Sequence, residues 1–468
     1  MLKIGGQEVS PKILVLAFAD VCAILLGIFL AMGLRFLYPD TVVSFVGYLR
    51  TPQMPGRVLT LLAVCMLALY HHDLYNLRTI NQHSEMFVRL LQALGTSCIV
   101  LAIIYYVEPR LSFGRGIALL SAPLILFFAI GIRLVAEHTW LILRKTERIL
   151  ILGTGAAGIS LTRKILSVPE LNLKVVGFLD ERGENIGKSL VNPGIIGGVG
   201  ELDAIVEREK IDRVILSLAE RRGRTPVRQL LDLKFAGVQV EDAHRFYEKI
   251  TGRIMLEQIS PSWLILSEGF QKSRLVLNVK RFIDVSICLI GVLLTLPLMG
   301  VLALAIWLES GSPIIFRQTR VGYKGRTFEM LKFRSMKQNA EANGPAWATE
   351  SDPRVTRLGR FLRKFRLDEL PQLFNVLRGE MSLVGPRPER PHFCSELEKE
   401  IPFFGLRHST RPGITGWAQI TYQYGGSVGE SRAKLEHDLF YIKHMSVPLD
   451  LTILFETFKV MIYGRGAK

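Results

Sequence analysis

The stretch FIDVSICLIGVLLTLPLMGVLALAIWL, residues 282–308, is a continuous apolar segment in a chain of 468 residues. A straight helix over it would be about 40 Å long, because an α-helix rises about 1.5 Å per residue, and this exceeds the thickness of the hydrocarbon core of a bilayer. Pro297 lies in its middle, where proline removes a backbone hydrogen bond and kinks a helix. The segment therefore fits a membrane, but not as a simple straight crossing.

Both flanks of this segment are basic. Lys280 and Arg281 precede it, and the cations that follow it are Arg317, Arg320, Lys324 and Arg326. A spanning helix should show its positive bias on one side. We therefore predict a re-entrant membrane helix over 281–308, which enters, bends at Pro297 and returns to the same face. A single crossing is the alternative, and it would put the neighbouring segments in different compartments.

Four more apolar stretches open the chain, near residues 13–34, 57–71, 87–107 and 117–136. Each approaches the roughly 20 residues that a helix needs to cross a bilayer, although the second is short. They predict a transmembrane domain of four helices over residues 1–145, with a buried bundle in a soluble protein as the alternative. Cations close behind the fourth stretch predict that the chain after it lies in the cytoplasm. Because four is an even number of spans, the N-terminus is predicted on the same side.

The composition agrees with a membrane location. Hydrophobic residues make up 49% of the chain, and the net charge is +16. Cations beside apolar spans indicate a membrane surface or anionic substrates, whereas nucleic acid is not an expected partner because no motif for it occurs. The five cysteines form no CxxC pair, which argues against a disulfide framework or a zinc site. The N-terminus lacks the pattern of a cleaved signal peptide.

The middle of the chain contains RILILGTGAAGISLTRKIL, residues 148–166, which reads as a strand, a glycine-rich turn and a helix. Gly153, Gly155 and Gly158 fit the G-x-G-x-x-G pattern that can bring backbone N–H groups onto a phosphate. We predict a Rossmann-like α/β domain over 146–265, with these glycines as candidate cofactor-binding residues. The Tyr-x-x-x-Lys dyad of a nucleotide-sugar dehydratase does not follow within this domain. A structural or regulatory role is therefore favoured over nucleotide binding.

From residue 309 onward the chain is rich in Gly, Pro, Arg and aromatic residues. The stretch PIIFRQTRVGYKGRTFEMLKFRSM, residues 313–336, reads as short basic strands around a turn. Such strands can be a solvated surface, or they can hold anionic lipid headgroups near the bilayer.

Two adjacent acids, Asp368 and Glu369, stand in RLDELPQLFNVLRGEMSLVGPRPER, residues 366–390, just after a run of cations. Proline is tolerated in the first helical turn, so Pro371 predicts a helix that begins near Asp368, where its positive end favours anions. Such a carboxylate would stay ionised and could coordinate Mg²⁺ or attack an electrophile. An ordinary helix cap with surface ion pairs is equally consistent with these residues alone.

Two further stretches, GPRPER at 385–390 and RPGITGWAQI at 411–420, set an arginine among Pro and Gly. Rigidly held guanidinium groups are suited to bidentate contact with phosphate. Ordinary loops also use Pro and Gly, so each stretch alone is a weak signal.

Together these stretches resemble a known family. The run from about 275 to 468 is similar to the polyprenyl-phosphate hexose-1-phosphate transferases, the bacterial initiating sugar transferases of exopolysaccharide, capsule and O-antigen synthesis. The resemblance rests on KRFIDV, FRQTRVGYKGRTFEMLKFRSM, RLDELPQLFNVLRGEMSLVGPRPE, RPGITGWAQ and the acid before the tyrosine of DLFY. The four spans and the Rossmann-like domain resemble the large, multi-domain members. The implied fold is a membrane protein of α plus α/β class, whose catalytic domain over 275–468 is small and mostly helical.

The resemblance implies a reaction at the inner membrane, on its cytoplasmic side. Asp368 would attack the sugar-linked phosphate of a UDP-sugar and release UMP, and undecaprenyl phosphate would then take the sugar phosphate from it. Glu369 would assist this catalysis. The implied cofactor is Mg²⁺, with Asp368 as its ligand. Membrane lipids are implied partners, and a homodimer through the N-terminal half is one arrangement that the sequence leaves open.

The remaining site residues follow from the same resemblance. The candidates for substrate binding are Lys332, Arg334, Arg363, Arg387, Pro388, Arg411 and, as a weaker one, Asp438. In the membrane helix, Lys280, Arg281 and Asp284 would anchor its start, while Pro297 sets its bend.

Two other functions compete with this interpretation. One is a membrane-anchored, NAD-dependent dehydratase or epimerase of nucleotide sugars, centred on the glycine-rich turn. The other is a regulator of polysaccharide export without enzymatic activity. The sequence does not name the sugar; we expect a hexose, and an N-acetylated sugar stays open.

Overall fold

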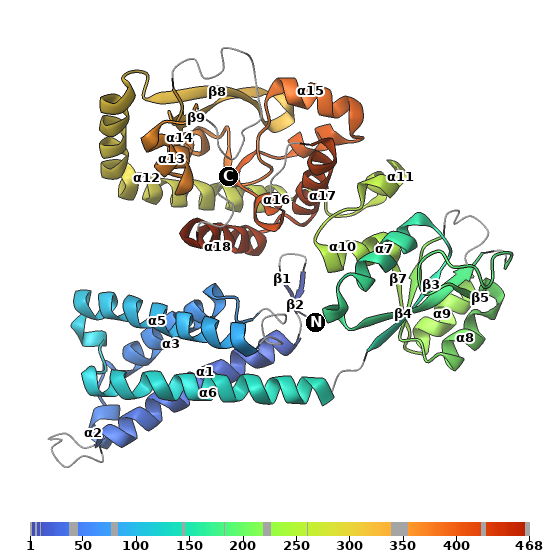
Figure 1. Ribbon diagram of the computed structural model, residues 1–468, viewed down its shortest axis with the longest axis horizontal. Helices are drawn as coiled ribbons and strands as arrows, with labels where there is room; N and C mark the ends of the chain where they lie inside the picture. The colour runs from blue at the N-terminus through green and yellow to red at the C-terminus, as the bar shows by residue number, and fades with distance from the viewer. Residues whose placement is uncertain are drawn as a thin grey trace.

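The computed structural model describes residues 2–4, 7–9, 11–36, 45–75, 83–142, 146–181, 183–218, 226–259, 261–337, 354–422 and 427–463. Figure 1 shows three bodies: a helical bundle in blue, an α/β unit in green, and a C-terminal unit in yellow to red. We call them the N-terminal bundle, the middle domain and the C-terminal domain.

The N-terminal bundle consists of long apolar helices that run side by side. Its elements are β1 (Leu2–Ile4), β2 (Gln7–Val9), α1 (Pro11–Phe36), α2 (Phe45–Leu49), α3 (Met54–His71), α5 (His83–Val107), η1 (Pro109–Leu111) and α6 (Arg115–Ile142). Within the described residues, five helices are long and apolar enough to cross a membrane, namely α1, α3, α5, α6 and the C-terminal domain's α12. Large apolar side chains such as Phe18 and Phe127 are exposed on the outside of the bundle, as lipid contact requires. The prediction that the N-terminal apolar segments are helices of a membrane protein is confirmed.

A buried ion pair fastens α1 to α6. Two guanidinium nitrogens of Arg133 donate to the two carboxylate oxygens of Asp20 at 2.7 and 3.1 Å, and neither side chain has exposed area. Charges within an apolar bundle are costly unless they are paired, so this bidentate contact fixes how the two helices pair.

The middle domain is a five-stranded parallel sheet in the order β5-β4-β3-β6-β7. Its strands are β3 (Glu147–Leu152), β4 (Leu173–Asp180), β5 (Ile195–Gly198), β6 (Arg213–Leu216) and β7 (Gln239–Asp242). Alternate side chains of β3 face opposite sides, so Ile149 and Ile151 pack with α7 (Ala156–Leu166) and α10 (Ala243–Thr251), while Leu150 and Leu152 pack with α8 (Leu202–Arg208) and α9 (Val227–Phe235). The predicted parallel α/β sheet is confirmed.

The C-terminal domain combines helices with three short strand pairings. Its elements are α12 (Arg274–Ser310), β8 (Ile315–Val321), β9 (Thr327–Phe333), α13 (Arg357–Lys364), η6 (Leu367–Glu369), α14 (Gln372–Arg378), β10 (Ser382–Val384), α15 (Pro391–Glu400), η7 (Phe404–Ser409), β11 (Gly413–Thr415), α16 (Trp417–Thr421), α17 (Val428–His444) and α18 (Val447–Tyr463). The pairings are an antiparallel hairpin of β8 and β9, a parallel pair of β10 and β11, and an isolated bridge. Buried side chains from α17, α18 and the β10–β11 region form its main core.

Helix α12 is 37 residues long with Pro297 inside it, and Figure 1 shows it bent into two arms. The first arm is tied to the domain by Lys280, whose ammonium donates to Asp450 on α18 at 2.6 Å, and by Asp284, which accepts from Ser382 at 2.7 Å. The end of the second arm is held by Arg334, which donates to the carbonyl of Ser310 at 2.7 Å. Both ends of this helix therefore attach to the same domain.

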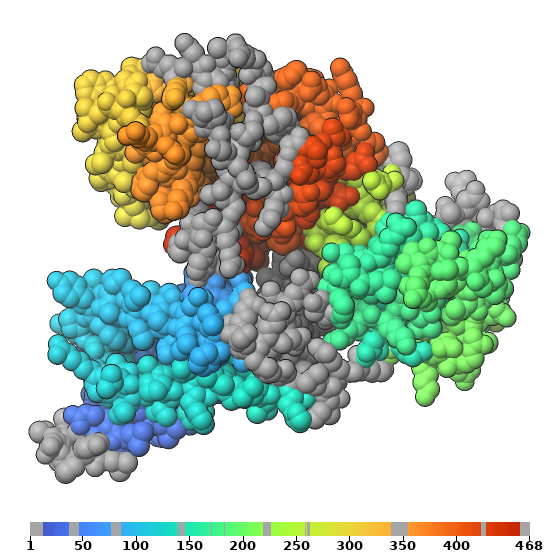
Figure 2. Space-filling view, viewed as in Figure 1, coloured from blue at the N-terminus to red at the C-terminus, as the bar shows by residue number. Residues whose placement is uncertain are grey.

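A set of polar contacts joins the middle domain to the C-terminal domain. Glu248 on α10 accepts from Lys443 at 2.7 Å and pairs with His444 at 2.6 Å. The indole of Trp417 donates to the carbonyl of Gly252 at 2.7 Å. In Figure 2 the yellow-green segment that follows α10 packs between the two domains. We call these contacts the domain junction.

Candidate functional site

The acid pair, Asp368 and Glu369, lies on the 3₁₀ turn η6 between α13 and α14. Arg366 enters this turn with a φ of 53°, the left-handed conformation that few side chains adopt, and so reverses the chain after α13. Pro371 stands immediately before α14, where its missing N–H costs no helical hydrogen bond. The predicted helix therefore begins at Gln372, slightly later than expected, and the acids lie on the turn that leads into it.

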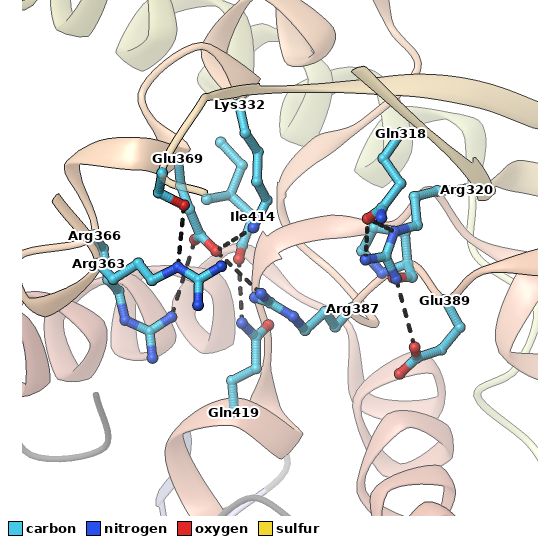
Figure 3. Close-up of polar contacts among 12 residues, drawn as sticks. Gln318, Arg320, Lys332, Arg363, Arg366, Glu369, Arg387, Glu389, Ile414 and Gln419 are labelled. Carbon is cyan, nitrogen blue, oxygen red and sulfur yellow. Dashed lines mark hydrogen bonds and ion pairs between the residues drawn. The ribbon is translucent and has the colours of Figure 1, made fainter. Parts of the chain in front are cut away.

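Glu369 is surrounded by cations. One of its carboxylate oxygens accepts from Lys332 at 3.1 Å and from Arg387 at 3.0 Å, while the other lies 4.0 Å from Arg366 (Figure 3). Burial alone would raise the pKa of Glu369, but the three cations together hold that pKa far below its usual range. Glu369 is therefore ionised and fully occupied with its neighbours.

Asp368 has a different environment. Its side chain is buried, with 7% of the residue exposed, and its carboxylate makes no hydrogen bond to any other described residue. Burial raises its pKa and the charge of Glu369 adds to that rise, whereas Lys332, Arg363 and Arg387 oppose it. The sequence predicted that this carboxylate would stay ionised, because it shows the cations and the helix start, but it does not show the burial that raises the pKa.

The three cations near Asp368 come from three different elements. Lys332 belongs to β9, Arg363 to α13 and Arg387 to the loop after β10. The guanidinium of Arg363 donates to the hydroxyl of Ser335 at 3.1 Å, which fixes its position. The structure thus brings three of the predicted phosphate-binding side chains around the acid pair.

The loop that contains Arg387 is held from two sides. Arg407 on η7 donates to the backbone carbonyl of Arg387 at 2.9 Å, and Arg320 on β8 donates to that of Pro388 at 3.1 Å. Arg320 also lies 3.7 Å from Glu389 in an ion pair. Pro388, a predicted substrate contact, therefore has its carbonyl engaged within the protein.

Arg407 was not among the sequence-predicted residues, although it lies four positions before the RPG motif. Its guanidinium is buried and forms an ion pair with Asp438 at 2.8 Å. Burial raises the pKa of Asp438 to about 6 despite this cation. Asp438 thus supports Arg407 behind the Arg387 loop and does not contact the acid pair.

Two predicted phosphate-binding arginines lie elsewhere. Arg411 donates to the carbonyl of Gly379 at the C-terminal end of α14, the end that also receives Arg281. Arg334 holds the end of α12 through Ser310. Both guanidinium groups satisfy carbonyls at helix ends, and neither contacts the acid pair.

The glycine-rich turn of the middle domain is filled by its own chain. A Cβ atom on Gly153 or Gly155 would lie 2.6 or 2.4 Å from the carbonyl oxygen of Ser217, which follows β6. The amide of Gly158 donates to the hydroxyl of Ser217 at 2.7 Å. Asp180, at the end of β4, accepts from the amide of Glu184 at 2.9 Å. Packing and hydrogen bonds within the chain are thus enough to explain why these residues occur here. Nucleotide binding at the turn stays the less favoured alternative.

The acid pair can supply one carboxylate ligand for the predicted Mg²⁺, but not a complete set of protein ligands. No group of three or more His, Cys, Asp or Glu side chains that could hold a metal occurs within the described ranges. Mg²⁺ in phosphate-binding sites, however, is commonly held by one or two carboxylates together with substrate phosphates. Asp368 offers a carboxylate without a hydrogen-bond partner among the described residues, which is the donor that such a site needs.

Comparisons with known proteins identify the families to which parts of this chain are similar. Residues 275–464 match the family model described as bacterial sugar transferase, and residues 71–238 match one described as CoA-binding domain. The chain is 42% identical over 233 residues to the UDP-N-acetylgalactosamine-undecaprenyl-phosphate N-acetylgalactosaminephosphotransferase of Aeromonas hydrophila, covering 50% of this chain and 54% of the relative. It is 33% identical over 340 residues to the undecaprenyl-phosphate glucose phosphotransferase of Komagataeibacter xylinus, covering 69% and 60%.

A third relative is covered more completely. The chain is 42% identical over 201 residues to the UDP-glucose:undecaprenyl-phosphate glucose-1-phosphate transferase of Caulobacter vibrioides, which is 42% of this chain and 75% of that relative. By contrast, the chain spans only 54% and 60% of the length of the Aeromonas and Komagataeibacter proteins. The bacterial sugar transferase match covers residues 275–464, which build almost all of the C-terminal domain.

Proposed function

Because the chain belongs to the bacterial sugar transferase family, we propose that it is an initiating sugar-phosphate transferase. It moves a hexose-1-phosphate from a UDP-sugar to undecaprenyl phosphate and releases UMP, for the synthesis of exopolysaccharide, capsule or O-antigen. Relatives whose names state this type of transfer support the assignment.

One observation supports the roles of the two acids. Glu369 is held by Lys332 and Arg387, whereas Asp368 has no hydrogen-bond partner among the described residues. A nucleophile must have an oxygen that is available to the substrate, and an orienting group must be fixed. Asp368 is therefore the nucleophile, and Glu369 positions the cations around it.

The reaction consists of two displacements at one phosphorus. A carboxylate oxygen of Asp368 attacks the sugar-linked phosphorus of the UDP-sugar, the bond to the bridging oxygen breaks, and UMP leaves with that oxygen. A phosphate oxygen of undecaprenyl phosphate then attacks the same phosphorus. The bond to Asp368 breaks, its carboxylate is restored, and the lipid carries a diphosphate-linked sugar. Two bulky substrates thus use one site in turn.

Charge neutralisation is the main task of the surrounding residues. A diphosphate repels a carboxylate, so the cations Lys332, Arg363 and Arg387 must offset that repulsion. Their guanidinium and ammonium groups lie around the acid pair from three sides and are fixed by protein contacts. Mg²⁺, held by Asp368 and by donor phosphates, would supply further positive charge.

In this proposal, the bent helix α12 holds the reaction at the membrane surface. Both of its arms attach to the C-terminal domain, through Lys280 in the first and Arg334 at the end of the second. A helix that crossed the bilayer could not keep both ends on one side, so these contacts support a re-entrant path with the bend at Pro297 inside the membrane. The site then faces the cytoplasm, where UDP-sugars dissolve and the lipid phosphate is accessible.

The test is a transfer assay with purified protein in detergent. Each radiolabelled donor from a panel of UDP-glucose, UDP-galactose, UDP-N-acetylglucosamine and UDP-N-acetylgalactosamine is offered with undecaprenyl phosphate, and label in the lipid phase is counted. We expect transfer from one hexose donor and release of UMP. Absence of transfer from every donor would contradict the proposal.

The same assay distinguishes the hexose donor from a second candidate, a UDP-linked N-acetylated sugar. The Aeromonas relative is named for N-acetylgalactosamine and the Caulobacter relative for glucose, at equal identity. Selective transfer of an N-acetylated sugar would keep the mechanism and replace the hexose.

A further inference from the structure

A pocket of about 460 Å³ lies between α7 of the middle domain and α17 of the C-terminal domain. Each helix contributes one face, since Ser160, Arg163, Lys164 and Ser167 recur at the spacing that lines one side of a helix, and α17 repeats that spacing from Gly429 to Glu436. Ligand sites typically have volumes of roughly 300–1,000 Å³ and often lie between domains. The pocket is therefore of the size and place at which small molecules bind.

The charges of the pocket are unbalanced. Its two acids are already neutralised, because Glu257 pairs with Arg432 at 2.9 Å and Glu436 pairs with Arg253 at 3.5 Å. Arg163 and Lys164 also line the pocket, and their side chains make no hydrogen bond or ion pair within the described part of the chain. Among the residues that the structure describes, two positive charges on the α7 side therefore lack a partner.

The helix dipole does not account for this arrangement. Cations in the last turn of a helix are favoured by the negative end of the dipole, which explains why Arg163 and Lys164 occur at this end of α7. It does not explain why they face a second domain across a pocket that also contains two ion pairs. An anion between the two helices would complete the charge balance.

The domain junction keeps the walls of the pocket in place. The amide of Ile254 donates to the backbone carbonyl of Glu436 at 3.1 Å, and the amide of Leu256 donates to the side chain of the same residue at 3.3 Å. Glu248 is fixed by Lys443 and His444 about two turns further along α17. A pocket with fixed walls is preorganised, which lowers the cost of binding.

We propose that this pocket binds a compact, water-soluble anion that bears phosphate, with Arg163 and Lys164 as its main contacts. The bound anion connects α7 to α17 and holds the middle domain against the C-terminal domain. Helix α17 also contains Asp438, which supports Arg407 behind the Arg387 loop, so an occupant of the pocket lies on an element that supports the acid pair.

The experiment measures binding of inorganic pyrophosphate to the full chain in detergent by calorimetry and by thermal unfolding. The variant Arg163→Gln/Lys164→Gln is compared with Arg228→Gln/Lys234→Gln, which removes two exposed cations from α9 of the same domain. Loss of two charge-assisted hydrogen bonds should weaken the Kd by about tenfold or more in the first variant, while the second changes it little.

The titration is repeated with protein that also carries Arg387→Gln. This substitution reduces pyrophosphate binding at the acid pair, so that the pocket dominates the signal. If the unaltered chain shows no pyrophosphate binding, or if both double variants lose it equally, the proposal is overturned. Transfer activity without pyrophosphate is measured in parallel. Both double variants keep the acid pair. A failed transfer assay would therefore contradict the proposed function but would not affect the result on pyrophosphate binding.

Discussion

The glycine-rich turn of the middle domain and the acid pair of the C-terminal domain both match well-known patterns, yet their surroundings differ. Ser217 fills the space beside the turn and bonds to the amide of Gly158. At the acid pair, three cations converge on a carboxylate, Asp368, that has no hydrogen bond within the described chain. A motif whose groups are satisfied by its own chain establishes a fold, whereas one that leaves a group unsatisfied indicates chemistry.

The same contrast exists inside the acid pair. Glu369 and Asp368 are neighbours in sequence. Lys332 and Arg387 bond to Glu369, whereas Asp368 makes no hydrogen bond to any residue in the described ranges. Their pKa values are accordingly moved in opposite directions, downward for Glu369 and upward for Asp368. Environments that separate the pKa values of two acids usually assign them different roles.

The largest effect should come from Asp368→Asn. The amide is nearly isosteric and cannot attack phosphorus, so turnover should fall by about 10³-fold or more, as it does when other nucleophiles are removed. UMP release measures this directly. Glu369→Gln is the matched control; it should retain measurable turnover and still form the sugar-phosphate adduct, seen by mass spectrometry with donor alone. Full activity of Asp368→Asn would show that Asp368 is not the nucleophile and that the two acids do not differ in the way proposed.

Next in size is Arg407→Gln. The substitution leaves Asp438 buried without its cation, which costs about 3–5 kcal/mol when a buried pair is broken. The unfolding temperature should fall, and the second substitution Asp438→Asn should recover part of the loss. Activity should fall as well, because the Arg387 loop loses a support. A double variant no more stable than Arg407→Gln would show that the two residues are not coupled.

A smaller effect is expected from Gly155→Ala in the middle domain. The new Cβ would lie 2.4 Å from the carbonyl of Ser217, so the turn must shift, at a cost of about 1–3 kcal/mol. Thermal unfolding of the full chain measures the loss, and Gly200→Ala, where a Cβ meets nothing within 4 Å, is the control. Equal stability of the two variants would mean that Ser217 does not fill the turn.

The smallest effect concerns pH. Attack requires the ionised form of Asp368, and burial raises the pKa of this group, so kcat/KM should decline as pH falls through a value above the ordinary 3.8. The pH profile of UMP release measures the position of this limb. Activity that stays constant down to pH 4 would contradict the raised pKa.

Sequence patterns predicted part of this structure well. The length of the apolar stretches predicts the long helices, and the pattern of strand, glycine-rich turn and helix predicts the α/β sheet, because burial of apolar residues decides both. The family resemblance also implies Lys332, Arg363 and Arg387 as phosphate contacts, and all three lie near the acids. The bent path of α12 through a membrane stays a prediction, supported by its contacts at both ends.

Other features depended on three-dimensional contacts. Arg411 looked equivalent to Arg387 in its Pro and Gly context, yet it lies at the opposite end of α14 from the acids. No sequence pattern marks Arg407, because its role is a contact to a backbone carbonyl twenty residues away. The direction of the pKa shift of Asp368 depends on burial, which a linear pattern does not report.

The cations around Glu369 have one more implication. Lys332 and Arg387 gave up part of their hydration when the chain folded, because a carboxylate was already present as their counter-ion. In the proposed reaction, an arriving diphosphate would meet cations that Glu369 already holds in place and that are already partly dehydrated, so less water would have to be removed on binding. Donor affinity should accordingly respond weakly to added salt, because Glu369 already neutralises part of the cationic charge. Glu369 also stays as a fixed negative group beside the donor, which would help to expel UMP once its phosphate is free.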